Sequence, residues 1–203
     1  MARVLMTAET APIPFKCVIH AESVGLTPEQ FFRLCSDNPD FRLELTAQKE
    51  IVIMSPSGLE SDWKSGEAFG QLREWAKRDR TGMAFGPSAG YTLPNGAVRS
   101  PDVSWLRKEK WNALTPAERR RFAPVSPDFV IELRSPSDAL SEQQAKMAEY
   151  IDNGAKLGFL IDPVKGRLYI YRPGQRTRWL KKPGSVSGDP ELPALTLDLT
   201  EIW

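Results

Sequence analysis

The sequence predicts an α/β or α+β domain in which helices flank a mixed β-sheet. From residue 59 onward, the apolar residues follow the order helix, three strands, helix, strand. Residues 129–133 form a nearly continuous apolar run, which is typical of a central strand buried on both faces. An antiparallel meander followed by a helical connection places helices on the faces of such a sheet.

The chain length fits one domain with an N-terminal arm. Its 203 residues suffice to bury a substantial core. Residues 1–25 show little pattern, and Pro12 and Pro14 interrupt any regular element there. We therefore expect residues 1–25 to form an arm and residues 26–203 to form the folded domain.

A helix and a β-hairpin are predicted ahead of the central sheet. Residues 27–30 read Thr-Pro-Glu-Gln, a helix start with a capping box and a proline at the first helical position. The helix ends at Asn38-Pro39. Residues 41–46 alternate between apolar and polar side chains, and residues 50–54 form a second strand, so we expect a hairpin.

The later elements follow from helical spacing, alternation and turn residues. They are a helix at 59–80, a broken strand at 83–93, a strand at 98–106, a short helix within 108–122 capped from Thr115, a strand at 129–133, a helix capped by Ser141 and closed at Asn153-Gly154, and strands at 157–161 and 167–171.

Composition excludes several classes of protein. His20 is the only histidine, which removes zinc hydrolase sites and Ser-His-Asp triads. Cys17 and Cys35 lack metal-type spacing, and we expect reduced thiols in a cytoplasmic protein. No apolar run approaches the roughly 18 residues of a membrane span. The net charge is +1, so any binding of nucleic acid depends on a local basic patch.

Two matching Pro-Asp phrases each open a short apolar strand. Residues 99–105 contain Asp102, and residues 126–134 contain Asp128 and Glu132. Glu132 is flanked by apolar residues, where a carboxylate is costly unless it is paired, protonated or bound to a cation. With Lys146 on the following helix, Asp102 and Glu132 are the parts needed to hold a divalent metal and activate water.

These phrases resemble the Uma2 family, also called DUF820, of the PD-(D/E)XK nuclease superfamily. The resemblance rests on residues 100–103, 127–137 and 146–154 and extends over most of the chain. It implies a restriction endonuclease-like fold and a metal-dependent endonuclease that acts on nucleic acid, with DNA as the expected substrate. It also implies that Asp102 and Glu132 bind Mg²⁺ or Mn²⁺ and that Lys146 is catalytic.

One departure from the superfamily pattern concerns the third strand. The pattern of acid, any residue, lysine here reads Glu132-Leu133-Arg134, and arginine is a poor substitute for a lysine that polarises water. We therefore expect Arg134 to bind a substrate phosphate and Lys146 to supply the catalytic amine. Tyr150, one helical turn after Lys146, is a second candidate for substrate binding.

Several alternatives stay open. Glu44 and Glu67 are candidates for an additional carboxylate ligand, or are merely exposed acids. The basic run between residues 107 and 121, with interleaved tryptophan and phenylalanine, is either a nucleic-acid surface or a solvated face. The chain could also be an inactive nucleic-acid-binding or regulatory module, or a scaffold whose six tryptophans form interfaces. The sequence leaves the oligomeric state open, and a homodimer is one candidate because dimers are the commonest assembly.

Overall fold

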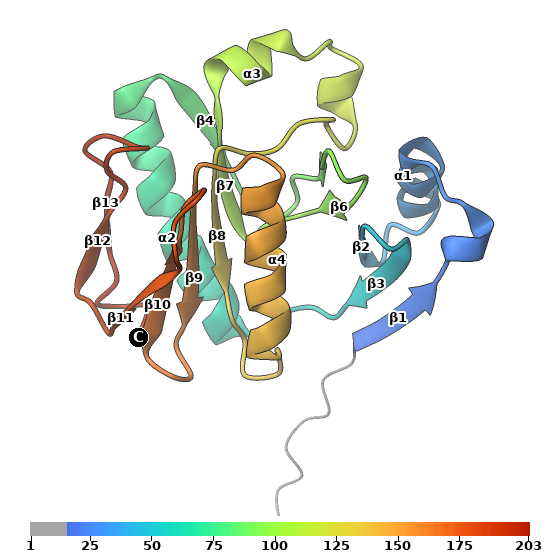
Figure 1. The fold of residues 1–203 in the computed structure, drawn as a ribbon. Helices are drawn as coiled ribbons and strands as arrows, with labels where there is room; N and C mark the ends of the chain where they lie inside the picture. Colours follow the sequence, from blue (N-terminus) through green and yellow to red (C-terminus); the bar gives the residue numbers. More distant parts are fainter. Residues whose placement is uncertain (1–15) are drawn as a thin grey trace, which may run out of the picture.

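A six-stranded mixed sheet forms the centre of the protein in the computed structural model, which describes residues 16–203 (Figure 1). Its spatial order is β11 (Arg178–Lys181), β10 (Arg167–Tyr171), β9 (Leu157–Asp162), β8 (Phe129–Leu133), β7 (Val103–Arg107) and β4 (Gly82–Phe85). Strands β8 and β9 are parallel, and helix α4 (Leu140–Asp152) connects them. The other pairs are antiparallel, so the predicted mixed sheet is confirmed.

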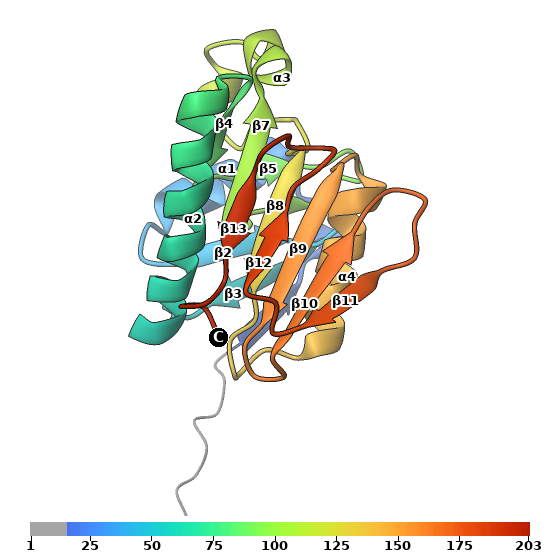
Figure 2. The ribbon, with the colours of Figure 1, turned by 90° about the vertical axis from the view of Figure 1, so that its left-hand side faces the viewer.

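Different elements cover the two faces of this sheet. Helix α2 (Leu59–Asp79) and the ribbon of β12 (Ser185–Ser187) and β13 (Thr196–Asp198) cover one face (Figure 2). Their apolar side chains pack with alternate residues of the strands, such as Ile131 and Phe159. Helix α4 covers the other face through Met147 and Tyr150. Burial of apolar surface on both faces holds the layers together.

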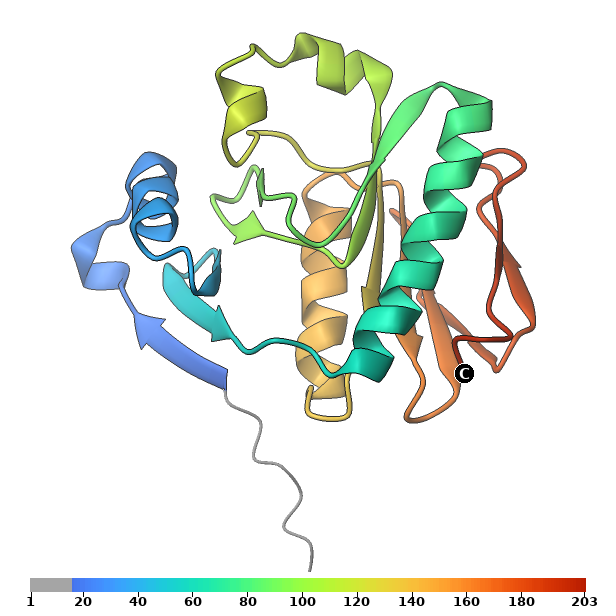
Figure 3. The ribbon, with the colours of Figure 1, turned by 180° about the vertical axis from the view of Figure 1, so that it is seen from behind.

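A second, five-stranded sheet lies beside the first, and Figure 3 shows it from behind. Its order is β1 (Lys16–His20), β3 (Glu50–Met54), β2 (Arg42–Leu45), β6 (Val98–Arg99) and β5 (Tyr91–Thr92). Helix α1 (Pro28–Asp37) buries Phe31 against Leu45 and Ile51 of this sheet. The predicted capping box between Thr27 and Gln30 is present, and so is the predicted hairpin of β2 and β3.

The structure differs from the sequence prediction at the N-terminus. Residues 16–20 were expected to belong to an arm, but they form β1, which pairs along its whole length with β3. A 3₁₀ helix at Glu22–Val24 follows. The strand forms because the exposed edge of the hairpin offers hydrogen-bonding partners, a tertiary effect that local periodicity does not report. The expected arm at residues 1–15 lies outside the described residues.

Other element boundaries also differ. The strand predicted at 98–106 is two strands, because residues 100–102 carry the chain from the second sheet to the central one. The helix predicted within 108–122 is helix α3 (Lys108–Ala113) and a separate 3₁₀ helix at Glu118–Arg120. Helix α4 begins at Leu140 without a side-chain cap, so the predicted Ser141 cap is wrong. Within residues 16–203, no helix is long and apolar enough to cross a membrane.

Candidate active site

The three predicted catalytic residues come from three different elements and meet beneath helix α4. Antiparallel pairing of Val103 with Ile131 places Asp102, at the entry to β7, across from Glu132 in β8. Lys146 extends from α4, which covers this face of the sheet. The chain crosses between the two sheets at Asp102, so the second sheet forms the remaining wall of the site.

Lys146 bridges two buried carboxylates. Its Nζ atom lies 2.9 Å from Glu132 Oε1 and 3.0 Å from Glu44 Oε1. The Tyr150 hydroxyl also donates to Glu132 Oε1, at 3.1 Å. Tyr150 is fully buried, so the structure shows it orienting Glu132. Direct contact of Tyr150 with a substrate stays a prediction.

Asp102 is the most accessible carboxylate of the three. Its Oδ2 atom accepts a hydrogen bond from the Leu133 backbone amide at 2.9 Å, and its side chain is 24% exposed. Its Oδ1 atom lies 4.0 Å from Arg42 Nη2, which is at the edge of the site. Among residues 16–203, neither Asp102 Oδ1 nor Glu132 Oε2 accepts a hydrogen bond. Two carboxylate oxygens are therefore left for a cation or water.

Glu44 joins the site from strand β2 of the second sheet. Its carboxylate accepts from the Ser100 backbone amide at 2.9 Å and pairs with Arg99 at 3.2 Å. Arg99 Nε in turn lies 2.5 Å from Glu149 Oε2 on α4. The sequence named Glu44 only as one of two alternatives, because strand alternation alone made it an exposed acid. The other alternative, Glu67, is exposed on α2, which covers the opposite face of the sheet.

Sequence reasoning did not single out Arg99 and Glu149 as parts of the site. Glu149 lies inside residues 146–154, which carry the family resemblance, and Arg99 begins the first Pro-Asp phrase, so these positions were the available signal. The complete acidic cluster has four carboxylates and two cations: Asp102, Glu132, Glu44 and Glu149 with Lys146 and Arg99. Arg42 lies at its edge. Carboxylates outnumber the buried cations, so the cluster favours binding of a further positive charge.

The protonation of the site follows from this crowding. Burial raises the pKa of Glu132 to about 7; Lys146 opposes the rise, while Asp102 and Glu44 add to it. Burial also raises the pKa of Asp102, again against the effect of Lys146. For Glu44, burial is outweighed by Lys146 and Arg99, and its pKa is lowered.

The pKa of Lys146 is raised as well. Burial alone would lower it, but the Glu132 and Glu44 carboxylates outweigh that effect. Lys146 is therefore an ammonium at neutral pH. It can donate hydrogen bonds and stabilise negative charge, but it is a poor proton acceptor.

The chemistry of the donor set fits a hard divalent cation. Mg²⁺ is commonly bound through one or two carboxylates, with water and substrate oxygens completing its coordination. Asp102 and Glu132 supply such a pair. No group of three or more histidine, cysteine, aspartate or glutamate side chains in the described part of the chain is arranged to hold a metal. Lys146 already takes the place between Glu132 and Glu44, so Glu44 is not a further ligand in this arrangement.

Arg134 lies apart from this cluster. Its Nη1 atom lies 3.0 Å from Asp162 Oδ1, and its Nε donates to the Asp138 carbonyl at 2.9 Å. Asp162 is fully buried, and the Arg134 side chain is 12% exposed. The structure therefore gives Arg134 a structural ion pair, and its expected contact with phosphate stays a prediction.

Comparison with known proteins agrees with this architecture. Residues 28–200 match the sequence model of the Uma2 family, described as "Putative restriction endonuclease". A crystal structure from Anabaena variabilis, described as a "putative nuclease belonging to DUF820", superposes with a TM-score of 0.71. It covers 87% of this chain and 97% of that chain at 22% identity, a likeness that shows the fold.

Short matches to curated proteins are also found. The "NADH dehydrogenase [ubiquinone] 1 alpha subcomplex subunit 4-like 2" of Bos taurus is 45% identical over 51 residues, and that of Mus musculus is 49% identical over 45 residues. The chain spans 58% and 52% of the length of these relatives, and the matches cover 24% and 21% of this chain. The family match is the one that covers the acidic cluster as a whole. The chain therefore belongs to the Uma2 family, with a restriction endonuclease-like fold and a nuclease-like function.

Proposed function

We propose that this protein is a metal-dependent endonuclease that hydrolyses phosphodiester bonds in DNA. The observation that carries this proposal is the convergence of Asp102 and Glu132 on facing strands, with Lys146 Nζ 2.9 Å from Glu132. A buried surplus of carboxylates is expensive for a fold. A role in binding a cation and an anionic substrate explains why it is present.

Asp102 and Glu132 would hold Mg²⁺ or Mn²⁺ through their free oxygens. A divalent ion at this place supplies a bound water of lowered pKa and neutralises charge on the phosphate. Hydrogen bonds from neighbouring groups orient the two carboxylates. Tyr150 fixes Glu132 through its hydroxyl, and the Leu133 amide fixes Asp102. Burial raises the pKa of Tyr150, so its hydroxyl keeps its proton and remains a donor.

Lys146 would stabilise negative charge that develops on the phosphate. An ammonium has three hydrogen-bond donors, and Glu132 and Glu44 engage two of them. The third donor is available to a phosphate oxygen or to the attacking water. The raised pKa of Lys146 opposes a role in deprotonating the attacking water.

Arg42 is the more accessible candidate for a phosphate contact. Its side chain is 41% exposed and lies beside Asp102, at the edge of the acidic cluster. Its Nη2 donates to the Ser100 carbonyl, which holds the guanidinium near the site. Arg134, in contrast, would have to leave the buried Asp162 to reach a phosphate.

The test is a cleavage assay with supercoiled plasmid DNA in Mg²⁺, in Mn²⁺ and in EDTA. Wild type should nick or linearise the plasmid with either metal and should be inactive in EDTA. Lys146→Met should lower the rate by about 100-fold, the usual cost of losing one charge-stabilising donor. Lys156→Met is the matched control, because it removes an exposed lysine outside the acidic cluster. Full activity of Lys146→Met together with loss of activity in Arg134→Lys would transfer the catalytic role to Arg134.

A second candidate function is a nucleic-acid-binding or regulatory module on the same fold. The observation that favours it is the Lys146 ammonium, which already pairs with two carboxylates. The absence of a three-ligand metal group among residues 16–203 points the same way. Binding of DNA without cleavage, across both metals and from pH 6 to 9, would establish this function instead.

A further inference from the structure

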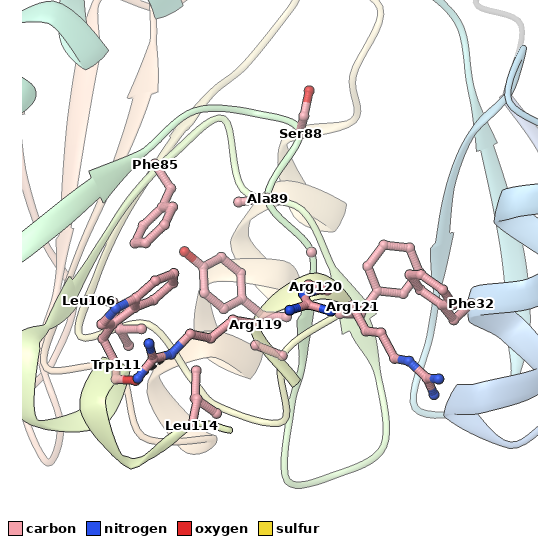
Figure 4. Close-up of a pocket in the computed structure, with 14 residues that line it drawn as sticks. Phe32, Phe85, Ser88, Ala89, Leu106, Trp111, Leu114, Arg119, Arg120 and Arg121 are labelled. Carbon is pink, nitrogen blue, oxygen red and sulfur yellow. Dashed lines mark hydrogen bonds between the residues drawn. The ribbon is translucent and has the colours of Figure 1, made fainter. Parts of the chain in front are cut away.

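A cavity of about 300 Å³ is lined by residues of helix α1, of the segment from β4 to β5 and of the segment after helix α3, and no proposed catalytic residue lines it (Figure 4). Its wall combines aromatic rings with consecutive arginines from the segment that follows helix α3. The rings belong to Phe32, Phe85, Tyr91, Trp111 and Phe122, and the arginines are Arg119, Arg120 and Arg121. This arrangement brings together the basic run and the interleaved aromatic residues that the sequence left unexplained.

The arginines are held in different ways. The Arg119 guanidinium lies over the Trp111 ring, 4.8 Å from its centroid, and Arg121 pairs with Glu29 beside the Phe32 ring. Arg120 is exposed, and its guanidinium makes no ion pair or hydrogen bond within the described part of the chain. One positive charge is thus unpaired at the cavity. Of the rings in its wall, Tyr91 is buried, and Phe32, Phe85, Trp111 and Phe122 are partly exposed.

This wall has the chemistry of a nucleotide. Aromatic rings stack with nucleobases whatever the sequence, and guanidinium groups bind phosphate and stack on rings as well. An apolar ligand would not require arginines. The volume lies at the lower end of small-ligand sites, roughly 300–1,000 Å³, and so suits a single base and its sugar better than a duplex.

The cavity is linked to the acidic cluster by short structural connections. Tyr91 lines the cavity and pairs across β5 and β6 with Arg99, which contacts Glu44 and Glu149. The Tyr91 hydroxyl lies 2.7 Å from Ser104 Oγ, two residues after Asp102 on strand β7. Strands β5, β6 and β7 therefore contribute both to the wall of the cavity and to the acidic cluster.

We propose that the cavity binds one unstacked base of the nucleic-acid substrate, with a flanking phosphate on Arg120. This inference rests on the proposed function for the class of substrate, and it adds a separate contact outside the acidic cluster. The base packs against the part of the half-buried Trp111 ring that Arg119, 4.8 Å from its centroid, and Phe85, with its own centroid 5.8 Å away, leave uncovered. Because stacking is tolerant of sequence, the site contributes affinity and strand positioning more than sequence preference.

Binding of single-stranded DNA to the wild-type chain in EDTA tests the proposal. The probes are a fluorescently labelled ten-residue oligothymidylate and an abasic oligonucleotide of equal length, at one fixed salt concentration because phosphate contacts depend on salt. Wild type should bind the thymidylate about tenfold more tightly, the effect expected of one stacked base. Trp111→Leu should remove this preference while the affinity for the abasic strand stays within about twofold.

Arg120→Ala keeps the test decisive if Trp111→Leu fails to fold, since Arg120 is exposed and unpaired. It should weaken binding of both oligonucleotides by about threefold to fivefold through loss of one phosphate contact. Arg176→Ala is the matched control, because Arg176 is another exposed arginine far along the sequence. It should leave both affinities within about twofold of wild type.

Equal affinity of wild type for the two oligonucleotides would overturn the proposal. So would a preference that survives in Trp111→Leu, or equal effects of Arg120→Ala and Arg176→Ala. Loss of a dimer in Trp111→Leu by sedimentation, without base dependence, would assign the cavity to a protein interface. Binding is measured in EDTA, so it is independent of the cleavage assay. Base-dependent binding by a protein that cleaves no DNA would refute the endonuclease function alone. Cleavage of DNA by a protein whose binding does not depend on the base would refute this inference alone.

Discussion

Asp102 and Asp128 follow a proline, begin neighbouring strands of the central sheet, and make the same backbone contact. Asp102 Oδ2 accepts from the amide of Leu133, the last residue of β8, at 2.9 Å. Asp128 Oδ2 accepts from the amide of Arg107, the last residue of β7, also at 2.9 Å. Because the strands are antiparallel, each aspartate ties down the end of the other strand.

The surroundings of the two aspartates differ in charge. Asp128 lies 3.0 Å from Lys110 Nζ and 3.9 Å from Arg107 Nε, so cations alone surround it. Asp102 shares its site with Glu132 and Lys146, and the nearby carboxylates are in excess. In both places the Pro-Asp phrase ties one strand of the sheet to the end of its neighbour. The neighbours contributed by other elements decide whether the carboxylate can also bind a cation.

The largest expected effect is on the rate of DNA cleavage, which should depend on Asp102 far more than on Asp128. Asp102→Asn should lower the rate of DNA cleavage by at least about 100-fold, because the amide removes a negatively charged metal ligand. Asp128→Asn should keep the rate within a few-fold of wild type, although its unpaired lysine lowers the free energy of unfolding. Single-turnover rates, measured well below both melting temperatures, make the comparison. A loss of activity in Asp128→Asn equal to that in Asp102→Asn would show that the strand ties themselves control catalysis.

Asp162 is another buried carboxylate, and it tests how far stability depends on the balance of buried charges. Its partner is Arg134, so removing the guanidinium leaves an unpaired buried charge. Arg134→Ala should lower the free energy of unfolding by about 3 kcal/mol, as is typical of a broken buried ion pair. Replacing both partners, in Arg134→Met with Asp162→Asn, should recover much of that loss. Urea denaturation of wild type, both single variants and the double variant measures the coupling.

If Arg134→Ala unfolded with the same free energy as wild type, the ion pair with Asp162 would not be needed for stability. Arg134 would then be available for the phosphate contact predicted from the sequence. Cleavage kinetics would then separate that role from catalysis. A phosphate contact raises the substrate concentration needed for half-maximal rate, whereas loss of a catalytic group lowers the maximal rate.

The pH dependence of stability tests the carboxylate surplus directly. The pKa of Glu132 in the folded protein, about 7, lies above its ordinary value of 4.5, so the folded state binds this proton more tightly than the unfolded state. Wild type therefore loses this contribution as pH rises from about 5 to 8, and the neutral Glu132→Gln variant does not. The stability of Glu132→Gln relative to wild type should increase by about 2 kcal/mol over this interval.

Glu44→Gln is the matched control, because it removes another buried carboxylate of the same cluster. The pKa of Glu44 is lowered from its ordinary value of 4.5, so the charged carboxylate stabilises the fold at pH values above 4.5. This stabilisation is lost only when the pH falls below 4.5 and the carboxylate takes up a proton. Its stability relative to wild type should therefore change less between pH 5 and 8 than that of Glu132→Gln, by only the part of the Glu132 pKa rise that Glu44 causes. Parallel pH profiles for the two variants would contradict the opposite environments that we assign to Glu44 and Glu132.

The fold was largely predictable because its signals are local. The capping box at Thr27, the alternation of the hairpin and the apolar run of β8 each appear within a few residues. Strand β1 was missed because its pairing partner lies some thirty residues away along the chain, at β3. Asp102, Glu132 and Lys146 were found through the phrases that contain them. The importance of Glu44 was underestimated, since only the meeting of the two sheets turns an alternating strand residue into a buried partner of Lys146.

The ion pair between Arg134 and Asp162 was also not predicted from the sequence. The sequence places Arg134 two residues after Glu132, which made it a natural neighbour of the site. The structure turns its guanidinium toward the end of β9, because parallel pairing of β8 and β9 brings Asp162 alongside. Strand register between distant segments depends on the helical connection and is not visible in local periodicity.

The smallest expected effect is the stabilisation of the fold by Mg²⁺, which should depend on Asp102 and not on Asp128. At pH 8 and a Mg²⁺ concentration ten times the dissociation constant, wild type should gain about 1.4 kcal/mol of stability, since the unfolded chain lacks the site. At pH 6, Glu132 is mostly protonated in the folded state. Because a proton competes with the metal, the same Mg²⁺ concentration should then give only about 0.4 kcal/mol.

Thermal melts at matched ionic strength would measure these gains. Asp128→Asn should respond to Mg²⁺ as wild type does, because that aspartate is already neutralised by Lys110 and Arg107. Asp102→Asn and Glu132→Gln should show no gain at either pH, because each lacks one of the two charged ligands. A gain that persists in both of these variants would place the metal elsewhere on the chain. A gain lost in Asp128→Asn as well would mean that Mg²⁺ binding depends on the shared strand ties rather than on the acidic cluster.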